Sequence, residues 1–244
     1  AKWSQWWDLQ DLGYNLLGKK EYDKALNIFS QSLDLSKEIS VSYERQSLTN
    51  IGYVYKRLEK YTVALSFYNK ALKVSREHNA KGEELATLLI IAAMYDYPWL
   101  SDYPNALDYY EQALVIAKET GDRPSEEKCL TSIGKLYMDV EKDEKAEEYL
   151  KKALLVSSEM GAQEKIWETQ NNLAQLAYLS GDKQKAKSYF IDTIKTVESI
   201  RGKISVEEYK TSFIENKLSV YTDLIYLLLE LKENEEAFNY VERA

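Results

Sequence analysis

The chain has 244 residues, of which 45% are hydrophobic and 30% are charged, so it can bury a sizeable core and remain soluble. Its net charge of −8 argues against a general nucleic-acid or anionic-membrane surface, because those partners require clustered Lys and Arg. No apolar run approaches the roughly 18 residues that a membrane-spanning helix needs. One cysteine and no Asn-x-Ser/Thr acceptor favour a cytoplasmic location.

In chain order, the sequence predicts six helix-turn-helix units, at about residues 5–40, 41–79, 81–121, 123–161, 162–200 and 205–244. Trp3, Trp6 and Trp7 lie at the start of the first unit. These tryptophans crowd an end where a stack of helices has no preceding neighbour. They are interpreted either as a hydrophobic cap or as an exposed docking patch.

The helical pattern is clearest between Tyr103 and Tyr137. Small and aromatic residues recur there at steps of three or four, which places them on one stripe of a helix. A turn follows at Gly121-Asp122, because glycine readily adopts the left-handed backbone that ends helices, and Pro124 suits the first turn of the next helix. The unit is therefore a helix, a short turn and an antiparallel helix.

The third unit carries one irregularity, in its inner turn. Tyr95 and Ala106 are 11 residues apart, whereas Tyr55 and Ala64 are 9 apart. Two prolines in the intervening DYPWLSDYPN segment forbid a continuous helix. We expect a surface bulge that displays Trp99, either as a tolerated insertion or as a binding element.

Two series of small residues keep one period along the chain. The residue at the turn of each unit gives intervals of 39, 42, 40, 40 and 51 in the series Ala25, Ala64, Ala106, Ala146, Ala186 and Ala237. The residue where paired helices touch gives 39, 40, 42 and 40 in the series Gly13, Gly52, Ala92, Gly134 and Ala174. Periods of this size indicate a repeat array.

The repeating unit resembles the tetratricopeptide repeat, which places a Leu-Gly-type pair, a Tyr, then Ala, an aromatic residue and Ala at fixed offsets. The second unit carries this pattern at Leu48, Ile51, Gly52, Tyr55, Ala64, Tyr68 and Ala71. The fourth carries it at Leu130, Ile133, Gly134, Tyr137, Ala146, Leu150 and Ala153. The period exceeds the family's usual 34 or so, which is similar to the kinesin-light-chain type with its Gly-Asp turns. The resemblance implies an all-α fold, a right-handed α-solenoid of about six repeats in a single domain.

The last interval, 51, is 11 longer than the usual 40. We interpret the extra residues as an added turn around Gly202 and an extended first helix in the last repeat. The final helix stops at Ala244 with an apolar face uncovered, so we expect further polypeptide to follow. The tail resembles the segment that precedes a caspase-like CHAT domain in bacterial proteins, through Ile200-Arg201, Glu207-Glu208, Ser212-Phe213, Tyr221, Leu224, Leu228, Glu235-Glu236-Ala237 and Tyr240-Val241-Glu242-Arg243-Ala244.

The sequence gives little support for catalysis, and we expect no enzyme activity, no cofactor and no metal. His78 is the only histidine and is interpreted as a solvated turn residue without an evident nucleophile. Cys129 is the only cysteine and lies next to an apolar stripe, which is typical of a packing thiol. No phosphate loop or metal-binding motif occurs.

Peptide binding fits the pattern better, because stacked helical pairs curve and their first helices line a concave groove. The positions that the family uses in that groove, opposite the packing stripe, are Tyr14, Gln46, Asn50, Tyr53, Arg57, Lys128, Ser132, Lys135, Asn171, Asn172 and Gln175. Asparagine can both donate to and accept from a peptide backbone. Lys56, Arg57, Lys128 and Lys135 predict an acidic partner, while Ile90 and Ala93 predict an apolar centre.

Three functions remain open at this stage. The first is a scaffold that binds an extended peptide or partner segment in its groove, and the second is a regulatory arm of a larger enzyme, such as a CHAT peptidase or a signalling kinase. A stand-alone enzyme is the third. The polar groove residues also have a simpler interpretation, which is that they only solvate the inner face.

Overall fold

The computed structural model describes residues 2–97, 100–203 and 217–243. Within these ranges the chain forms twelve α-helices and no strand, so the fold is all-α, as predicted. The helices are α1 (Lys2–Gly18), α2 (Tyr22–Ser36), α3 (Val41–Arg57), α4 (Tyr61–Glu77), α5 (Lys81–Asp96), α6 (Tyr103–Thr120), α7 (Arg123–Asp139), α8 (Asp143–Glu159), α9 (Gln163–Leu179), α10 (Lys183–Lys203), α12 (Leu218–Glu230) and α13 (Asn234–Arg243).

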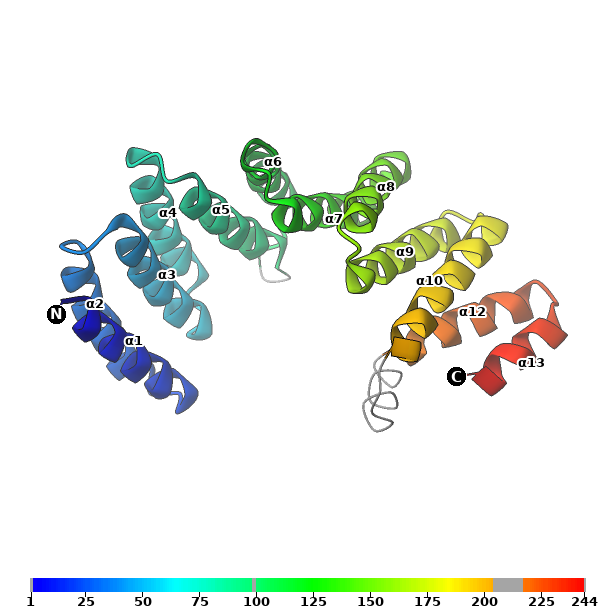
Figure 1. Ribbon diagram of the computed structural model, residues 1–244, viewed down its shortest axis with the longest axis horizontal. Helices are drawn as coiled ribbons and strands as arrows, with labels where there is room; N and C mark the ends of the chain where they lie inside the picture. Colours follow the sequence, from blue (N-terminus) through cyan, green and yellow to red (C-terminus); the bar gives the residue numbers. More distant parts are fainter. Residues whose placement is uncertain (1, 98–99, 204–216, 244) are drawn as a thin grey trace. The chain divides into compact units, whose positions relative to one another are not determined.

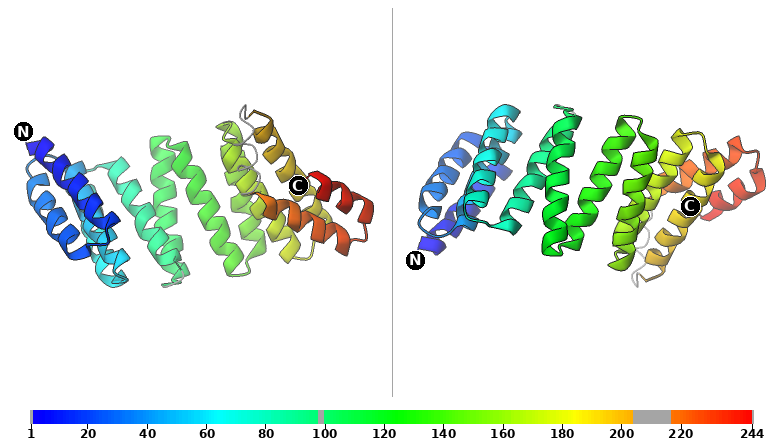
Figure 2. Two further views of the ribbon diagram at one scale, coloured as in Figure 1. Left: turned by 90° about the horizontal axis from the view of Figure 1, so that it is seen from below. Right: turned by 90° about the horizontal axis from the view of Figure 1, so that it is seen from above.

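The helices fall into two compact units, residues 1–122 (unit 1) and residues 123–244 (unit 2). In unit 1, helices α1 and α2, α3 and α4, and α5 and α6 pair as hairpins, and each hairpin packs on the next through α2 on α3 and α4 on α5 (Figure 1). Unit 2 repeats this plan with α7 and α8, α9 and α10, and α12 and α13 (Figure 2). Hairpins stacked in sequence order are the arrangement of a repeat solenoid.

Glycines permit the close approach of paired helices, as the spacing predicted. A Cβ added at Gly13 would lie 2.5 Å from Cε1 of Phe29, and one added at Gly52 would lie 2.6 Å from Cε1 of Tyr68. At Gly134 the corresponding distance, to Cγ of Leu150, is 2.8 Å. Each of these glycines is on the first helix of its hairpin and faces a large buried residue of the second. The small residue therefore recurs with the repeat period because close packing of the two helices of a hairpin requires it.

The predicted turn at Gly121 is confirmed. Gly121 has φ 71°, in the left-handed region, and its N–H closes the end of α6. The start of α6 is capped by Asp102, whose Oδ1 accepts a hydrogen bond of 3.2 Å from the backbone N–H of Asn105, with Pro104 in the first turn. The connection between α5 and α6 is longer than the one between α3 and α4, as expected, but Trp99 lies outside the described residues.

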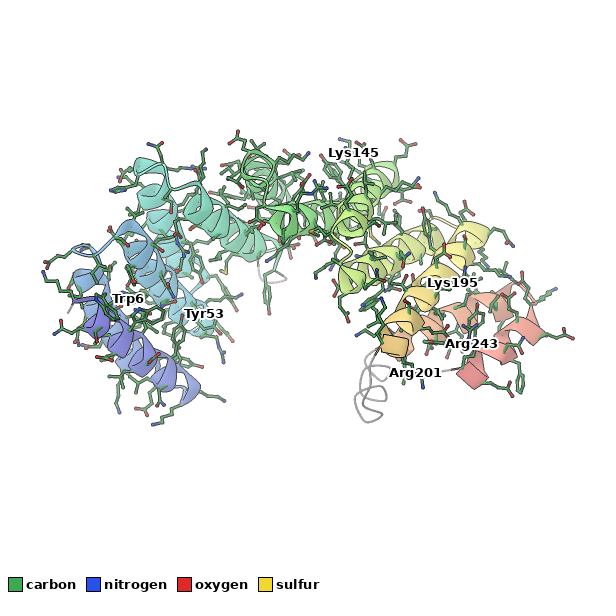
Figure 3. The ribbon with its side chains drawn as sticks, in the orientation of Figure 1. Trp6, Tyr53, Lys145, Lys195, Arg201 and Arg243 are labelled. Atoms are coloured by element: carbon green, nitrogen blue, oxygen red, sulfur yellow. The ribbon has the colours of Figure 1, made fainter. Side chains whose placement is uncertain are left out.

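The three tryptophans at the start of the chain have different surroundings. Trp6 is fully buried and points toward α3, where its Nε1 donates a hydrogen bond of 2.9 Å to Oγ of Ser47 (Figure 3). Its ring also packs edge-on against Tyr43. Trp3 and Trp7 remain 57% and 47% exposed. Of these three tryptophans, only Trp6 is part of the buried core of unit 1.

The end of the chain differs from the prediction at one point. Gly202 does not form a turn, because α10 continues through it to Lys203 and reaches 21 residues. Part of the extra length in the last repeat is therefore in the second helix of the fifth hairpin. The extension expected at the start of the last repeat, from residue 205, falls on residues 204–216, outside the described ranges.

Candidate functional site

A pocket of about 390 Å³ in unit 1, hereafter the unit 1 pocket, opens on the first helices of three consecutive hairpins. Its walls come from α1, α3 and α5, with one residue from α4 at the base. The lining residues are Tyr14, Thr49, Asn50, Tyr53, Lys56, Tyr68, Ile90, Ala93 and Met94. The pocket thus combines an apolar side on α5 with hydroxyl, amide and ammonium groups on α1 and α3.

The Asn50 amide is held by neighbouring side chains. Its Oδ1 accepts a hydrogen bond of 2.9 Å from the hydroxyl of Tyr14, and its Nδ2 donates to Oε1 of Gln10. Gln10 in turn donates from Nε2 to Oγ of Ser32, at 2.8 Å. Asn50 and Gln10 are both buried. This chain of bonds fixes the wall of the pocket and leaves Asn50 less free to bind a ligand than its position in the sequence suggests.

The charged group on the pocket wall is the ammonium of Lys56. Its Nζ lies 4.7 Å from the centroid of the Tyr97 ring, a cation–π arrangement. Arg57, one residue further along α3, donates weakly from Nη1 to the Tyr53 hydroxyl at 3.5 Å. Burial raises the pKa of the Tyr68 phenol at the base, which therefore stays neutral at physiological pH. The unit 1 pocket is consequently cationic.

A second pocket, of about 370 Å³, is in unit 2 and is hereafter the unit 2 pocket. It lies between α9 and α12, the first helices of the last two hairpins, and reaches α10. Its lining residues are Gln175, Tyr178, Leu179, Phe190, Asp223, Tyr226 and Glu230. Both charged side chains in this set are carboxylates, so its charge is opposite to that of the unit 1 pocket.

The two carboxylates have different surroundings. Glu230 accepts a hydrogen bond of 2.8 Å from the Tyr178 hydroxyl and pairs with Lys183 at 3.0 Å. The Lys183 hydrogen bond is the main reason why the pKa of Glu230 is lowered. Burial instead raises the pKa of Asp223, and a hydrogen bond from Gln175 only partly opposes that effect.

The sequence-predicted groove residues divide among several places. Tyr14, Asn50 and Tyr53 meet in the unit 1 pocket, together with Ile90 and Ala93, which were predicted to form an apolar centre. Gln175 lines the unit 2 pocket. The others lie outside both lining sets, on α3, α7 and α9: Gln46, Arg57, Lys128, Ser132, Lys135, Asn171 and Asn172. Ligand binding by all of these residues remains a prediction.

Sequence reasoning missed most of the unit 2 pocket, although the repeat register contains it. In the first unit Gly13 precedes Ala25 by 12 residues, and counting 12 back from Ala237 reaches Ile225. The next residue, Tyr226, is then the counterpart of Tyr14, Tyr53, Ala93, Lys135 and Gln175. By the same count, Asp223 is the counterpart of Asn50. The signal was hidden because Ile225 is not a small residue.

Cys129 and His78, the two residues considered for catalysis, lie outside both pockets. Cys129 is fully buried, and Nδ1 of the exposed His78 lies 3.0 Å from the Val74 carbonyl oxygen at the end of α4. Residues 2–97, 100–203 and 217–243 contain no group of three or more His, Cys, Asp or Glu side chains placed to hold a metal ion. Over the same ranges, every helix is too short or too polar to cross a membrane.

The fold and pockets define an all-α helical-repeat protein in which the first helices of the hairpins line a pocket in each unit. The sequence model for the tetratricopeptide repeat matches residues 6–77, 39–114 and 83–156, and the chain belongs to this family. Repeat arrays of this kind serve as protein-interaction scaffolds and are typically non-catalytic. No curated protein matches the chain.

Solved structures show the same fold at low sequence identity. The putative kinesin light chain repeats of Podosopora anserina are 15% identical, with a TM-score of 0.64, and the match covers 80% of this chain and 95% of that one. A STAND signal-transduction ATPase with a tetratricopeptide repeat sensor, from Pyrococcus horikoshii, is 16% identical, with a TM-score of 0.74. The match covers 98% of this chain and 36% of that one. A Rap protein complexed with Competence and Sporulation Factor is 15% identical, with a TM-score of 0.59. The match covers 98% of this chain and 73% of that one.

Proposed function

We propose that this protein is a scaffold that binds an extended segment of a partner protein along its first helices, with the unit 1 pocket accepting an acidic side chain next to an apolar one. The observation that carries the proposal is the composition of this pocket. The ammonium of Lys56 is its charged group, and the described lining set contains no carboxylate. Ile90, Ala93 and Met94 supply an apolar surface beside it.

Electrostatics and hydrogen bonding favour such a ligand. A partner carboxylate near Lys56 would gain a charge-assisted hydrogen bond, and the Tyr53 hydroxyl could donate a second. Tyr53 is 40% exposed, so its ring can also cover part of an incoming side chain. A basic side chain at the same place would be repelled by Lys56 and Arg57. Within unit 2, Lys128, Lys135 and Asn172 are proposed as separate contacts to the partner.

The test uses selection from a displayed library of random peptides on the full chain. Enriched peptides are expected to carry Asp or Glu next to a bulky apolar residue. Their affinity should fall about tenfold in Lys56→Glu, because the charge is reversed. Lys118→Glu, at an exposed site on α6 outside the pocket, is the matched control and should bind as the parent does. Enrichment of basic peptides, or equal loss in the two variants, would refute the proposal.

A second candidate function is a regulatory arm of a larger enzyme, proposed to be a CHAT peptidase or a signalling kinase. The support comes from the fold shared with the Pyrococcus horikoshii ATPase, whose repeat region is named a sensor and of which this chain spans about a third. The test is the coding sequence downstream of Ala244. An open frame encoding a catalytic domain would support this function, and an immediate stop codon would remove it.

A further inference from the structure

The unit 2 pocket contains a carboxylate that its surroundings do not neutralise. Asp223 accepts a hydrogen bond from Gln175, and no Lys or Arg of residues 123–203 or 217–243 forms an ion pair with it. The neighbouring Glu230 differs, because Lys183 and Tyr178 already satisfy it. A partly buried anion without a counter-ion is unfavourable, so the pocket gains most from a ligand that brings a positive charge.

The walls of the pocket favour one type of cationic group over another. Tyr178 and Tyr226 are 37% and 63% exposed, and their rings can stack on a flat cation. Leu179 and Phe190 provide an apolar surface for an aliphatic stem. A planar guanidinium can stack on a tyrosine while it donates to a carboxylate, which a compact ammonium does less well.

The same unit already uses this chemistry within the chain. The guanidinium of Arg243 lies 4.7 Å from the centroid of the Tyr240 ring and donates to both oxygens of Glu198, at 2.7 and 2.6 Å. That arrangement joins one guanidinium, one tyrosine ring and one carboxylate. The unit 2 pocket likewise brings tyrosine rings and a carboxylate together in one lining set.

We propose that the unit 2 pocket receives an arginine side chain of a partner protein, with the guanidinium on Asp223 between Tyr178 and Tyr226 and the stem against Leu179. An acidic side chain would meet two carboxylates, and a neutral apolar one would bury the charge of Asp223 further. The chain thus carries two pockets of opposite preference, one in each unit. This inference does not depend on the ligand of the unit 1 pocket.

The test uses two small probes, N-acetyl-arginine methylamide and N-acetyl-citrulline methylamide, which differ in charge and hardly in shape. Each is titrated into the full chain while backbone amide resonances are followed. The arginine probe should give saturable shifts centred on Gln175, Asp223 and Tyr226, and the citrulline probe should bind about fivefold more weakly. Equal binding of the two probes would overturn the proposal, as would arginine shifts centred elsewhere.

Variants separate this site from a general effect of charge. Asp223→Asn keeps the shape of the side chain and should weaken arginine binding about tenfold while leaving citrulline binding unchanged. Tyr226→Ala removes a stacking ring and should weaken binding of the arginine probe about threefold. Glu235→Gln removes an exposed carboxylate on α13, outside the pocket, and should have no effect. Arginine binding that survives Asp223→Asn would refute the assignment, whatever the outcome of the peptide selection on unit 1.

Discussion

The hydroxyl of Tyr14 on α1 donates a hydrogen bond of 2.9 Å to Oδ1 of Asn50 on α3, and so joins the first helices of two neighbouring hairpins. Asn50 also donates to Gln10, which lies one helical turn before Tyr14. A position that the family pattern assigns to ligand binding is therefore also part of the internal support of unit 1. Its substitution will change stability as well as affinity.

Substitution of Asn50 by Ala should lower the free energy of unfolding of unit 1 by about 1–3 kcal/mol, because the buried amide of Gln10 loses its partner. Tyr14→Phe, which removes only the hydroxyl, should cost about 0.5–1.5 kcal/mol. Urea denaturation measures both values. In the double variant the costs should be less than additive, since the two residues share one bond. Full additivity would show that the hydrogen bond contributes nothing.

Gly52→Ala should destabilise unit 1 by about 1–3 kcal/mol, because the added Cβ would lie 2.6 Å from the ring of the buried Tyr68. The control is Gly82→Ala near the start of α5, where nothing lies within 4 Å of the added Cβ. That variant should be neutral or more stable by up to about 1 kcal/mol, since alanine loses less entropy than glycine in a helix. Thermal denaturation of both variants makes the comparison. Similar melting temperatures would contradict the packing argument.

The repeat period could be predicted from the sequence because it reflects a steric requirement. The two helices of a hairpin can meet only if the residue at Gly13, Gly52 or Gly134 is small. The residue type at these positions therefore reveals the requirement. The turns between helices were less visible. Gly121 marks one, but Lys20, Glu59 and Glu141 also adopt positive φ, at 60°, 59° and 54°. Residue type does not mark such positions, because tertiary packing compensates for the strain.

The candidate sites were only partly predictable. The register placed Tyr14, Tyr53 and Gln175 on the pocket-lining side, since a residue's face follows from helical periodicity. Which of those residues are engaged by others depends on side chains far apart in sequence, such as Gln10 with Asn50 or Tyr178 with Glu230. A single sequence contains no direct signal for such pairs.

The contribution of Glu127 to the stability of unit 2 should be less unfavourable in mild acid than at neutral pH. It is 3% exposed, and burial raises the pKa of its carboxyl despite a hydrogen bond of 2.8 Å from Oγ1 of Thr131. The folded state therefore holds this proton more tightly than the unfolded state. The contribution of Glu127 is unfavourable above its folded-state pKa and disappears as the pH falls below its unfolded value.

The variant Glu127→Gln tests this pH dependence. It should raise the melting temperature at pH 7 and leave it nearly unchanged at about pH 4, where the parent carboxyl is largely protonated in the folded state. Glu235→Gln, at an exposed position on α13, should change neither value. A variant of Glu127 that is less stable than the parent at pH 7 would show that the ionised carboxylate is favourable where it lies.

The C-terminal end of helix α13 is joined to α10 through Glu198. Arg243, labelled in Figure 3, donates to this carboxylate from Nε and Nη2. The Tyr221 hydroxyl donates to it at 3.2 Å. Burial and the adjacent Glu198 charge raise the pKa of Tyr221 to about 12, so the phenol keeps its proton and remains a donor. Only Ala237 and Tyr240 of α13 are buried, and near the start of the helix Lys187 of α10 also pairs with Glu236, at 2.6 Å, so the Glu198 contacts hold chiefly the end that carries Arg243.

Glu198→Gln should therefore loosen α13 without unfolding unit 2. A neutral amide still accepts one hydrogen bond but loses the charge that pairs with Arg243, which is partly exposed, so the expected cost is about 0.5–1 kcal/mol. Amide hydrogen exchange along α13 should accelerate about two- to fivefold, while exchange in α9 stays as in the parent. Glu235→Gln is again the matched control. Uniform acceleration throughout unit 2 would contradict a local role, because it would mean that Glu198 stabilises the unit as a whole.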